Sequence, residues 1–591
     1  MTTLQEIIRK LSIAIFALGI ALTARAQEFG SWDVPVPHPE HWWVPVPGFK
    51  PVEPGEHPRI LFREKDLPWL RSKMDKPEGK MLLSRLRHLL NGGDGRSMPL
   101  FFNPADSAYT NGHYEQLVID SAGVYTFGHV AGYGLLFQLT GDTLYANLGR
   151  QCFELALQGQ RDRDDRYSWV DPGGALRAGP VLGWMAVGYD LCYNGWDEAT
   201  RIRLGKAIEH YSTDMISKWG DGLRVDLASL TSGTMPPTSN HYSMQTGGAA
   251  LALLVIDKEP WANQERIDSL LQVSQRSMVH NANQGFGDGG YYAEGDGTGS
   301  MATYIAYLTA LQGWKNTLGK DFGGAQLPNV RMMALKWLYL TYVEDGKPAI
   351  WPTRGGYPHN AWSRSGLSGA GYFGLAFGVL PAEYAAALQW FYERFLEDAD
   401  QEAGILYEPT AYPHIVAATF VNWPDTLDAR NPSEVLPHCY QDSRYGFYAW
   451  RNRWKDNDDI IITALTQSAH GFMGAKADTA FQIRAFGQNF SWGEIPGAVA
   501  LWGRSQNGRR SVMSFENGQS VAIGFPKKDA PRALLVATGK HDGELVTVKG
   551  QMVTVKYLSQ SPTPEIRVRG NRIKVGPYRL RLRHGALEWI N

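Results

Sequence analysis

The sequence predicts an α+β protein in which a long helical domain is followed by an antiparallel sheet domain. Between His57 and about Leu396, apolar residues recur at three- and four-residue spacing in consecutive segments, each about one helix long. After about residue 400 the segments become short and rich in β-branched or aromatic residues, with Asn517-Gly518 and Asp542-Gly543 as hairpin turn pairs. A chain of 591 residues is long enough for two or more domains.

Residues 1–26 have the pattern of a secretory signal peptide. Arg9 and Lys10 precede the apolar run Leu11–Ala24, and Ala24-Arg25-Ala26 fits a small-x-small cleavage site, so cleavage is expected after Ala26. The run of about 14 residues is short for a membrane span, and an uncleaved anchor is the alternative. The mature protein is therefore expected to be periplasmic or secreted, with no membrane contact after cleavage.

Residues 27–56 are rich in proline and tryptophan and show no periodicity, which predicts an extended arm on the surface of a later domain. Over the helical domain, 57–400, short joints between helices favour antiparallel helix pairs. An α/α toroid is one way to close such pairs, but periodicity does not show closure. Helices are expected at 79–91, 129–140, 142–158, 178–194, 197–219, 242–257, 261–280, 298–318, 328–344 and 382–396.

The sheet domain, 401–591, is expected to be an antiparallel sandwich. In its last predicted strand, Arg579, Arg581 and Arg583 alternate with leucines, which indicates a half-buried strand with a basic, solvated edge. Strands are expected at Phe447–Trp450, Ile460–Thr466, Phe481–Phe486, Ser511–Phe515, Ala533–Ala537, Leu545–Val548, Met552–Tyr557, Ile566–Val568 and Tyr578–Leu582.

Composition narrows the function classes and the cofactors. A net charge of −1 gives no indication of nucleic-acid binding. The 20 Trp, 27 Tyr and 23 Phe suit sugar faces and core packing equally well. Cys152, Cys192 and Cys439 are far apart and have no metal-ligand spacing, so we interpret them as buried thiols, with one disulfide pair as an alternative in an oxidising compartment.

The stretch Thr238–Gly248 leads directly into the apolar segment Ala249–Ile256 and carries the candidate site. Ser239 or Asn240 can cap the helix that begins there. Asn240 and His241 would then lie at the positive end of the helix dipole, where anions are favoured. An amide and an imidazole at this position can bind a substrate carboxylate; the alternative is a simple cap beside a surface histidine.

Several short sequence motifs occur in the same order as in a known protein family. They are His57–Phe62, Leu136–Ala146, Tyr189–Leu191 before a helix with Glu198 and Arg201, Asn240-His241, Gly289–Gly295, Asp442–Tyr445, Ala449–Arg451, His470-Gly471 and Ala477-Asp478. Together they resemble the heparinase II/III-like polysaccharide lyases, including the alginate lyases of similar architecture. The resemblance covers roughly residues 57–500.

The resemblance implies an incomplete α/α toroid followed by an antiparallel β-sandwich, with the substrate cleft across the toroid and the sheet domain as one wall. The implied reaction is β-elimination at a 4-linked uronic acid of an acidic polysaccharide or oligosaccharide. Asn240 and His241 match the family's carboxylate-neutralising pair, and His241 is alternatively the base for one epimer. His470 matches the family's sheet-domain histidine that reaches the cleft.

The sequence departs from the family at the catalytic tyrosine, which commonly follows the Glu-Gly phrase within a few residues. Tyr304 is preferred over Tyr292 as base and acid, and either needs nearby cations to lower its pKa from about 10. Tyr292 and Glu294 are the expected substrate-binding residues on this phrase. Arg354 and His359 lie on a Gly-rich loop that suits a sugar carboxylate, with an exposed turn as the alternative.

Some relatives carry a structural zinc in the sheet domain, but no clear ligand set repeats it here, so no metal or other cofactor is expected. Two further functions remain open at this point. One is a glycoside hydrolase that pairs Glu294 with Asp288 or Asp296. The other is a non-catalytic glycan-binding relative that has lost its tyrosine.

Overall fold

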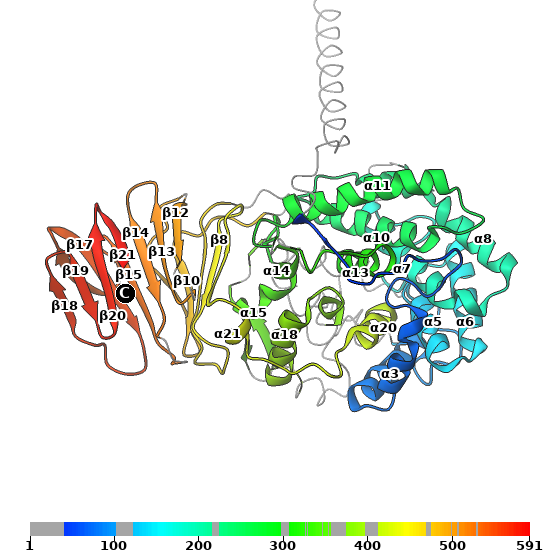
Figure 1. Cartoon of the computed structure of the whole chain (residues 1–591), viewed down its shortest axis with the longest axis horizontal. Coiled ribbons are helices and arrows are strands. Elements are labelled where there is room, and N and C mark those ends of the chain that lie inside the picture. The colour runs from blue at the N-terminus through cyan, green and yellow to red at the C-terminus, as the bar shows by residue number, and fades with distance from the viewer. Residues whose placement is uncertain are drawn as a thin grey trace, which may run out of the picture.

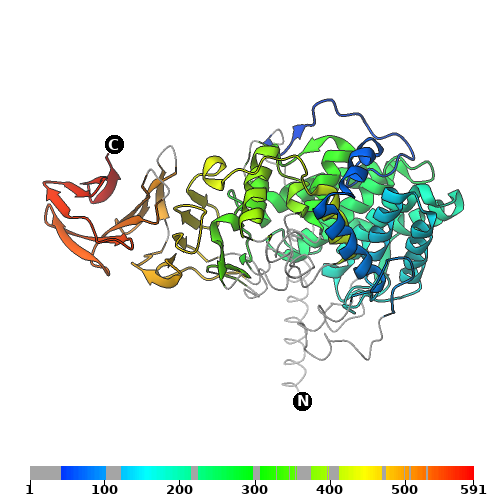
Figure 2. The same ribbon diagram turned by 90° about the horizontal axis from the view of Figure 1, so that it is seen from below.

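The structure is a computed structural model with a helical part at one end and a sheet part, which includes the C-terminus, at the other (Figure 1 and Figure 2). The elongated arrangement is clear in both views, and it agrees with the predicted α+β class. The described residues are 41–101, 122–214, 224–296, 306–325, 327, 329–344, 347–352, 354–355, 374–395, 397, 412–468, 474–497, 499–504, 508–526 and 530–590.

Two helices that are buried nearly all round lie at the centre of the helical domain. In α7 (Ala175–Cys192) every residue except Arg177 is buried, and in α10 (Asn240–Ile256) every residue except His241 is buried. A helix without a polar face belongs in a domain interior. The backbones meet where a Cβ on Gly248 would lie 1.9 Å from the carbonyl oxygen of Gly179, so only glycine fits at this crossing.

The other helices surround this pair. Helix α5 packs against α6, α7 and α20, and α10 packs against α9, α11 and α13. Whether they close into a toroid remains a prediction. Their bounds are α2 Leu67–Lys73, α3 Pro77–Asn91, α5 His129–Thr140, α6 Thr143–Leu157, α8 Glu198–Glu209, α9 Leu227–Ser232, α11 Gln264–His280, α13 Tyr307–Leu318, α14 Asn329–Leu335, α15 Trp337–Leu340, α18 Ala382–Phe395, α20 Pro413–Asn422 and α21 Pro432–Val435.

Two predicted helices are too long. The segment expected at 197–219 ends at Glu209 and is followed by the strands β2 (Ser212–Asp214) and β3 (Arg224–Asp226), which pair with each other. The segment expected at 328–344 breaks into α14 and α15, and then pairs β5 (Thr341–Glu344) with β6 (Lys347–Ile350). The β-branched and aromatic residues at 341–343 favour this strand.

The helical part also extends further along the chain than residue 400. Helices α20 and α21 lie within the range assigned to the sheet domain, and the first strand of that domain begins at Cys439. Helix α20 packs on α3 and α5, so the chain returns to its first helices before it enters the sheets. A short apolar run such as 413–422 is ambiguous between strand and buried helix, so the sequence gives no clear signal for this helix.

Three antiparallel sheets are stacked in the C-terminal part, where a sandwich was predicted. They run in the orders β11-β10-β9-β8-β7, β12-β13-β14-β15-β17-β16 and β18-β19-β20-β21. The strands are β7 Cys439–Asp442, β8 Phe447–Arg451, β9 Ile461–Leu465, β10 Phe481–Ala485, β11 Gln488–Trp492, β12 Val499–Arg504, β13 Arg510–Phe515, β14 Ser520–Gly524, β15 Ala533–Thr538, β16 Glu544–Val548, β17 Gln551–Leu558, β18 Ile566–Arg569, β19 Arg572–Val575, β20 Tyr578–Arg583 and β21 Ala586–Trp589.

Side-chain alternation divides the apolar residues among three clusters. One face of the five-stranded sheet, with Phe447 and Ala449, joins the large cluster of the helical domain. Its other face, with Trp450 and Ile462, packs on the six-stranded sheet. The far face of the six-stranded sheet packs on the four-stranded sheet. The first sheet therefore shares its core with the helices, and the third lies furthest from them.

The described end of the N-terminal arm lies on the helical domain, as predicted. Its strand β1 (Val44–Pro45) pairs with β4 (Lys320–Asp321), and Trp42 is buried. The predictions for residues 1–26 concern a segment outside the described residues. No helix in the described part of the chain combines the length and apolarity that a membrane span requires.

Candidate functional site at the start of helix α10

The first turn of α10 presents an amide and an imidazole. Ser239 is the cap residue, and its hydroxyl accepts a hydrogen bond from the backbone N–H of His241 at 3.3 Å. Asn240 is therefore the first helical residue rather than the cap. The residue is 8% exposed, and its side chain makes no hydrogen bond in the described part of the chain. His241 is half-buried and is the one residue of α10 that reaches the surface.

A π-helical turn, η5 (Asn281–Gly285), lies against this helix start. The Ser243 hydroxyl donates to Oδ1 of Asn281 at 2.7 Å, and a Cβ on Gly285 would lie 2.4 Å from the carbonyl oxygen of Pro237. The two segments therefore touch at the entrance of α10. Single π-helical turns are rare, and those within α-helices are frequent at functional sites.

The sheet domain reaches the same place through the loop after β7. The Tyr445 hydroxyl donates to the carbonyl oxygen of Gln284, and the Arg444 guanidinium donates to the backbone and side-chain oxygens of Asn283. The Asp442 carboxylate accepts from the backbone N–H groups of Gly289 and Tyr291, at 3.0 and 2.9 Å. The start of α10 therefore lies near the junction of the two domains, where ligand sites are frequent.

Asp442–Tyr445 is one of the segments that resemble the lyase family, but no role for these residues follows from the sequence. A local signal was present, because Asp442 also accepts from the backbone N–H of Tyr445 at 3.0 Å, as an aspartate does at the start of a turn. Their partners on η5 and on the Gly289–Tyr291 segment are more than 150 positions away, so no local pattern reveals this contact.

Tyr292 is enclosed rather than open to a ligand. Its side chain is 0% exposed, and its ring lies 4.9 Å from the ring of Phe286. Burial, and then the neighbouring Glu294 carboxylate, raise the pKa of the Tyr292 hydroxyl well above its usual range. Because a base must lose its proton, this environment is opposite to the one that a catalytic tyrosine needs.

The Arg354 side chain binds residues of the sheet domain. Its guanidinium forms a bidentate ion pair with Asp478 and donates to the Thr463 hydroxyl at 2.9 Å. The predicted role was the binding of a sugar carboxylate, but in the described arrangement a protein carboxylate holds that position. Arg354 itself is buried, so the alternative of an exposed residue does not hold at this position.

Two carboxylates of the hydrolase alternative are also enclosed. Glu294 is 1% exposed and Asp296 is 0% exposed. Asp296 accepts from the backbone N–H of Arg354 at 3.2 Å and lies 3.6 Å from the Lys336 ammonium group. Burial raises the pKa of Asp296, although both cations lower it. These two residues therefore do not form an acid and a base that flank an open sugar site.

Three expected site residues, Tyr304, His359 and His470, lie outside the described residues. Their roles stay predictions. Of the eight residues named from the sequence, the described structure therefore places Asn240 and His241 together at a helix start, and encloses Tyr292, Glu294 and Arg354.

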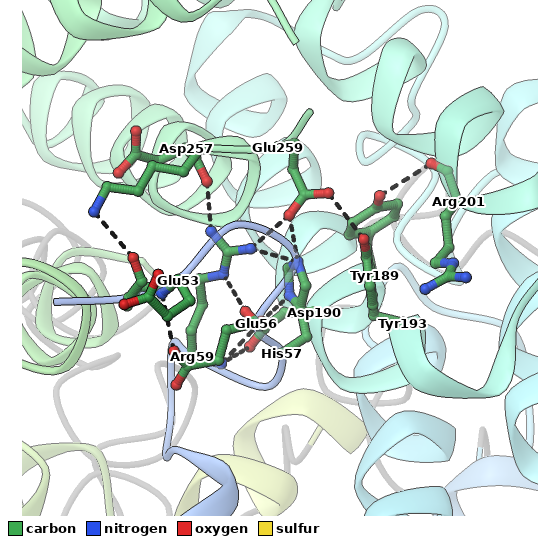
Figure 3. Close-up of polar contacts among 12 residues, drawn as sticks. Glu53, Glu56, His57, Arg59, Tyr189, Asp190, Tyr193, Arg201, Asp257 and Glu259 are labelled. Carbon is green, nitrogen blue, oxygen red and sulfur yellow. Dashed lines mark hydrogen bonds and ion pairs between the residues drawn. The ribbon is translucent and has the colours of Figure 1, made fainter. Parts of the chain in front are cut away.

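A second cluster of titratable side chains lies at the other end of α10 (Figure 3). The His57 imidazole lies between the carboxylates of Asp190, at 2.6 Å, and Glu259, at 3.0 Å. Arg59 also pairs with Glu259, at 2.6 Å, and all of these side chains are 0% exposed. This closed network lies about 24 Å from Asn240 by the helix rise, and it ties the beginning of the domain to α7 and to the end of α10.

Cys152, Cys192 and Cys439 are free and buried and form no disulfide. This agrees with their interpretation as buried thiols. Within the described ranges, no three His, Cys, Asp or Glu side chains come together in a way that could hold a metal ion.

No protein-family model and no curated protein matches the chain. Among solved structures, the chain is similar to heparinase III, at 9% identity over 85% of this chain and 77% of that chain, with a TM-score of 0.37. It is also similar to the chondroitin AC lyase of Streptomyces coelicolor A3 in complex with chondroitin sulphate, at 10% identity over 89% and 76%, with a TM-score of 0.38.

A third similar structure, of chondroitinase AC lyase with oligosaccharides, has 9% identity over 88% of this chain and 75% of that chain, with a TM-score of 0.32. The solved structures are thus polysaccharide lyases, the class that the sequence motifs resemble. At these identities and TM-scores they add nothing to the site, which rests on the residues of this chain.

Proposed function

We propose that the protein is a polysaccharide lyase that cleaves a uronic-acid-containing polysaccharide by β-elimination at the start of α10. The observation that carries the proposal is the Asn240 amide, which is nearly buried, has no side-chain hydrogen bond in the described structure and lies in the first turn of a 17-residue helix. A donor held there is suited to an anionic group.

The chemistry needs such a donor. Removal of the proton from C5 of a uronic acid puts further negative charge on the neighbouring carboxylate. The Asn240 amide and the His241 imidazole, beside the exposed N–H groups of the helix start, can stabilise this charge as an oxyanion hole does. His241 is alternatively the base for the epimer whose proton lies on the opposite face of the ring.

The proton transfers themselves are assigned to Tyr304, as base and acid, and His470 of the sheet domain is assigned a catalytic role with it. This assignment comes from the sequence resemblance. A catalytic role for His470 requires the sheet domain to lie close to α10. The contacts between the loop after β7 and η5 support that requirement. The enclosure of Tyr292 favours Tyr304 over Tyr292.

The decisive comparison is between Asn240→Ala and Ser239→Ala. Loss of one oxyanion-hole donor is expected to lower kcat on the cleaved uronate polymer by about 100- to 1,000-fold. The adjacent cap variant is expected to lose about 1 kcal/mol of stability and to keep most of its activity. Activity is followed by the ultraviolet absorbance of the unsaturated uronate, and folding by thermal unfolding.

Two results would count against the proposal. If Asn240→Ala cleaves as fast as the parent protein, the amide is not part of the site. If the products have gained the mass of water, the protein is a hydrolase. Binding of uronate polymers without any turnover would instead indicate the glycan-binding alternative.

We also propose that the protein is exported to the periplasm or secreted, because of the signal pattern of residues 1–26. N-terminal sequencing of the mature protein is expected to begin at Gln27, and a mature chain that begins at Met1 would contradict export by cleavage.

A further inference from the structure

The outer face of the four-stranded sheet carries a dense cationic surface. Its inner face, with Ile573, Leu580 and Leu587, packs on the six-stranded sheet. Exposed and buried residues alternate along β19 and β20, so the charged residues point away from that core. The exposed cations, named here the basic face, are Arg567, Arg569, Arg572, Lys574, Arg579, Arg581 and Arg583.

Strand register places these cations in rows across the sheet. Arg567 is opposite Lys574, which is opposite Arg579. In the next row, Arg569, Arg572 and Arg581 are opposite one another in turn. Neighbouring strands lie about 4.8 Å apart, so each row places three positive side chains close together.

Few acidic residues balance this surface. Between Glu565 and Glu588 these two residues are the sole acids in the sequence, and they pair with Arg567 and Arg581 at 2.6 and 2.5 Å. The other five cations have no ion pair within the described chain. On a protein with a net charge of −1, this is a strong local excess of positive charge.

The explanation offered from the sequence, a solvated edge that guards against aggregation, does not fit. Strands β19 and β20 are the two inner strands of the sheet, so they have no free edge to protect. Like charges directly opposite each other on neighbouring strands are destabilising. The rows of like charge therefore lower the stability of the free protein, and a bound polyanion would offset this loss.

We propose that the basic face binds an acidic polysaccharide at a second site, remote from the start of α10. Six of its seven cations are arginines, whose planar guanidinium groups bind carboxylate and sulfate groups with two parallel hydrogen bonds. The outward positions of the four strands, all of them described, carry no aromatic ring on which a nucleic-acid base could stack. The choice of polysaccharide over other polyanions rests on the proposed function.

The position of the basic face fits a role in binding the polysaccharide rather than in cleaving it. Sheet β18–β21 lies at the end of the molecule furthest from α10 (Figure 1). A long polymer held there would stay close to the protein while another part of it enters the site at the domain junction. Linked sites of this kind raise the effective concentration of the second segment.

The test is a charge-removal variant, Arg569→Gln/Arg572→Gln/Arg579→Gln, in the full chain. Its control is Lys65→Gln/Lys80→Gln/Lys455→Gln, which removes three exposed cations on other elements. Binding of labelled alginate and heparin is measured by fluorescence anisotropy at low and at physiological salt. We expect affinity about tenfold lower in the first variant, with a weaker salt dependence, and little change in the control.

Equal affinity in the parent protein and in the first variant would overturn the inference, and so would an equal loss in the control variant. Duplex DNA that binds as tightly as heparin, with the same loss in the first variant, would also overturn it, because the face would then not select polysaccharides. If binding is lost as expected but no uronate polymer is cleaved, the proposed function fails and the second site stands. Intact cleavage of short oligosaccharides by the first variant would support a role separate from catalysis.

Discussion

Lys73 is a buried lysine whose hydrogen-bond acceptors in the described chain are all backbone carbonyl groups at one end of α20. Its ammonium group, 3% exposed, donates to the carbonyl oxygens of Phe420 at 2.5 Å, Val421 at 3.0 Å and Trp423 at 2.7 Å. The last carbonyl groups of a helix have no partner within the helix, so a cation at this position both donates to them and favours the dipole.

Lys73→Met keeps the length of the side chain but removes the donor. Because the buried carbonyl groups would be left without a partner, we expect the free energy of unfolding to fall by about 1–3 kcal/mol, measured by denaturant unfolding. Lys76→Met is the matched control, since Lys76 is 41% exposed and pairs with Asp425. It is expected to cost at most about 1 kcal/mol. Equal losses in the two variants would show that Lys73 does not cap α20.

Local residue roles could be predicted from the sequence, and distant pairings could not. A helix start between Ser239 and Asn240 follows from capping chemistry within two residues, and Ser239 is the cap. Arg354 was assigned to a substrate carboxylate because an arginine on a Gly-rich loop can bind one with two parallel hydrogen bonds. Its partner, Asp478, lies 124 positions later in the chain and comes close only through the packing of two domains.

At the scale of elements, the crossing of α7 and α10 depends on glycine. Gly248→Ala would place a methyl group 1.9 Å from the Gly179 carbonyl oxygen, and backbone atoms cannot move aside as a side chain can. We expect a loss of about 1–3 kcal/mol or more, and a lower Tm in calorimetry, because the two helices must separate.

Gly313→Ala on α13 is the matched control for this prediction. Its Cβ would lie 3.1 Å from Cδ1 of Leu254, the end of a flexible side chain. Alanine is the better helix former by up to about 1 kcal/mol, so this variant is expected to be neutral or stabilising. A Gly248→Ala protein as stable as the Gly313→Ala protein would contradict the tight crossing.

Elements with a clear period were predicted closely, and some of those without one were missed. Helices α6 and α18 lie within a residue of the expected bounds because their apolar stripes are regular. Strand β14, with all five residues buried, shows no alternation, and α20 is apolar on every side. Burial on both faces removes the periodic signal on which such predictions rest.

At the scale of the whole molecule, the helical and sheet parts are joined by polar contacts as well as by a shared core. Arg451 on β8 donates to the carbonyl oxygens of Leu338 at 2.8 Å and Thr341 at 2.6 Å. The Trp454 indole N–H also donates to Leu338, at 2.6 Å. The rings of Tyr291 and Phe447 stack at 4.1 Å across the same junction. The helical and sheet parts are therefore held together by several independent contacts.

The Arg354–Asp478 pair is the test of this junction, because both side chains are largely buried, at 6% and 12% exposed. Asp478→Leu leaves a buried guanidinium without its counter-charge, and we expect a loss of about 3–5 kcal/mol in the free energy of unfolding. Adding Arg354→Met should recover much of that loss, since an apolar pair of similar volume replaces the ion pair. Glu434→Leu, which breaks the exposed pair with Arg430, is expected to cost about 0.5 kcal/mol or less. If Asp478→Leu costs no more than Glu434→Leu, the ion pair does not hold the domains together, and the Arg354 guanidinium would again be available to a sugar carboxylate.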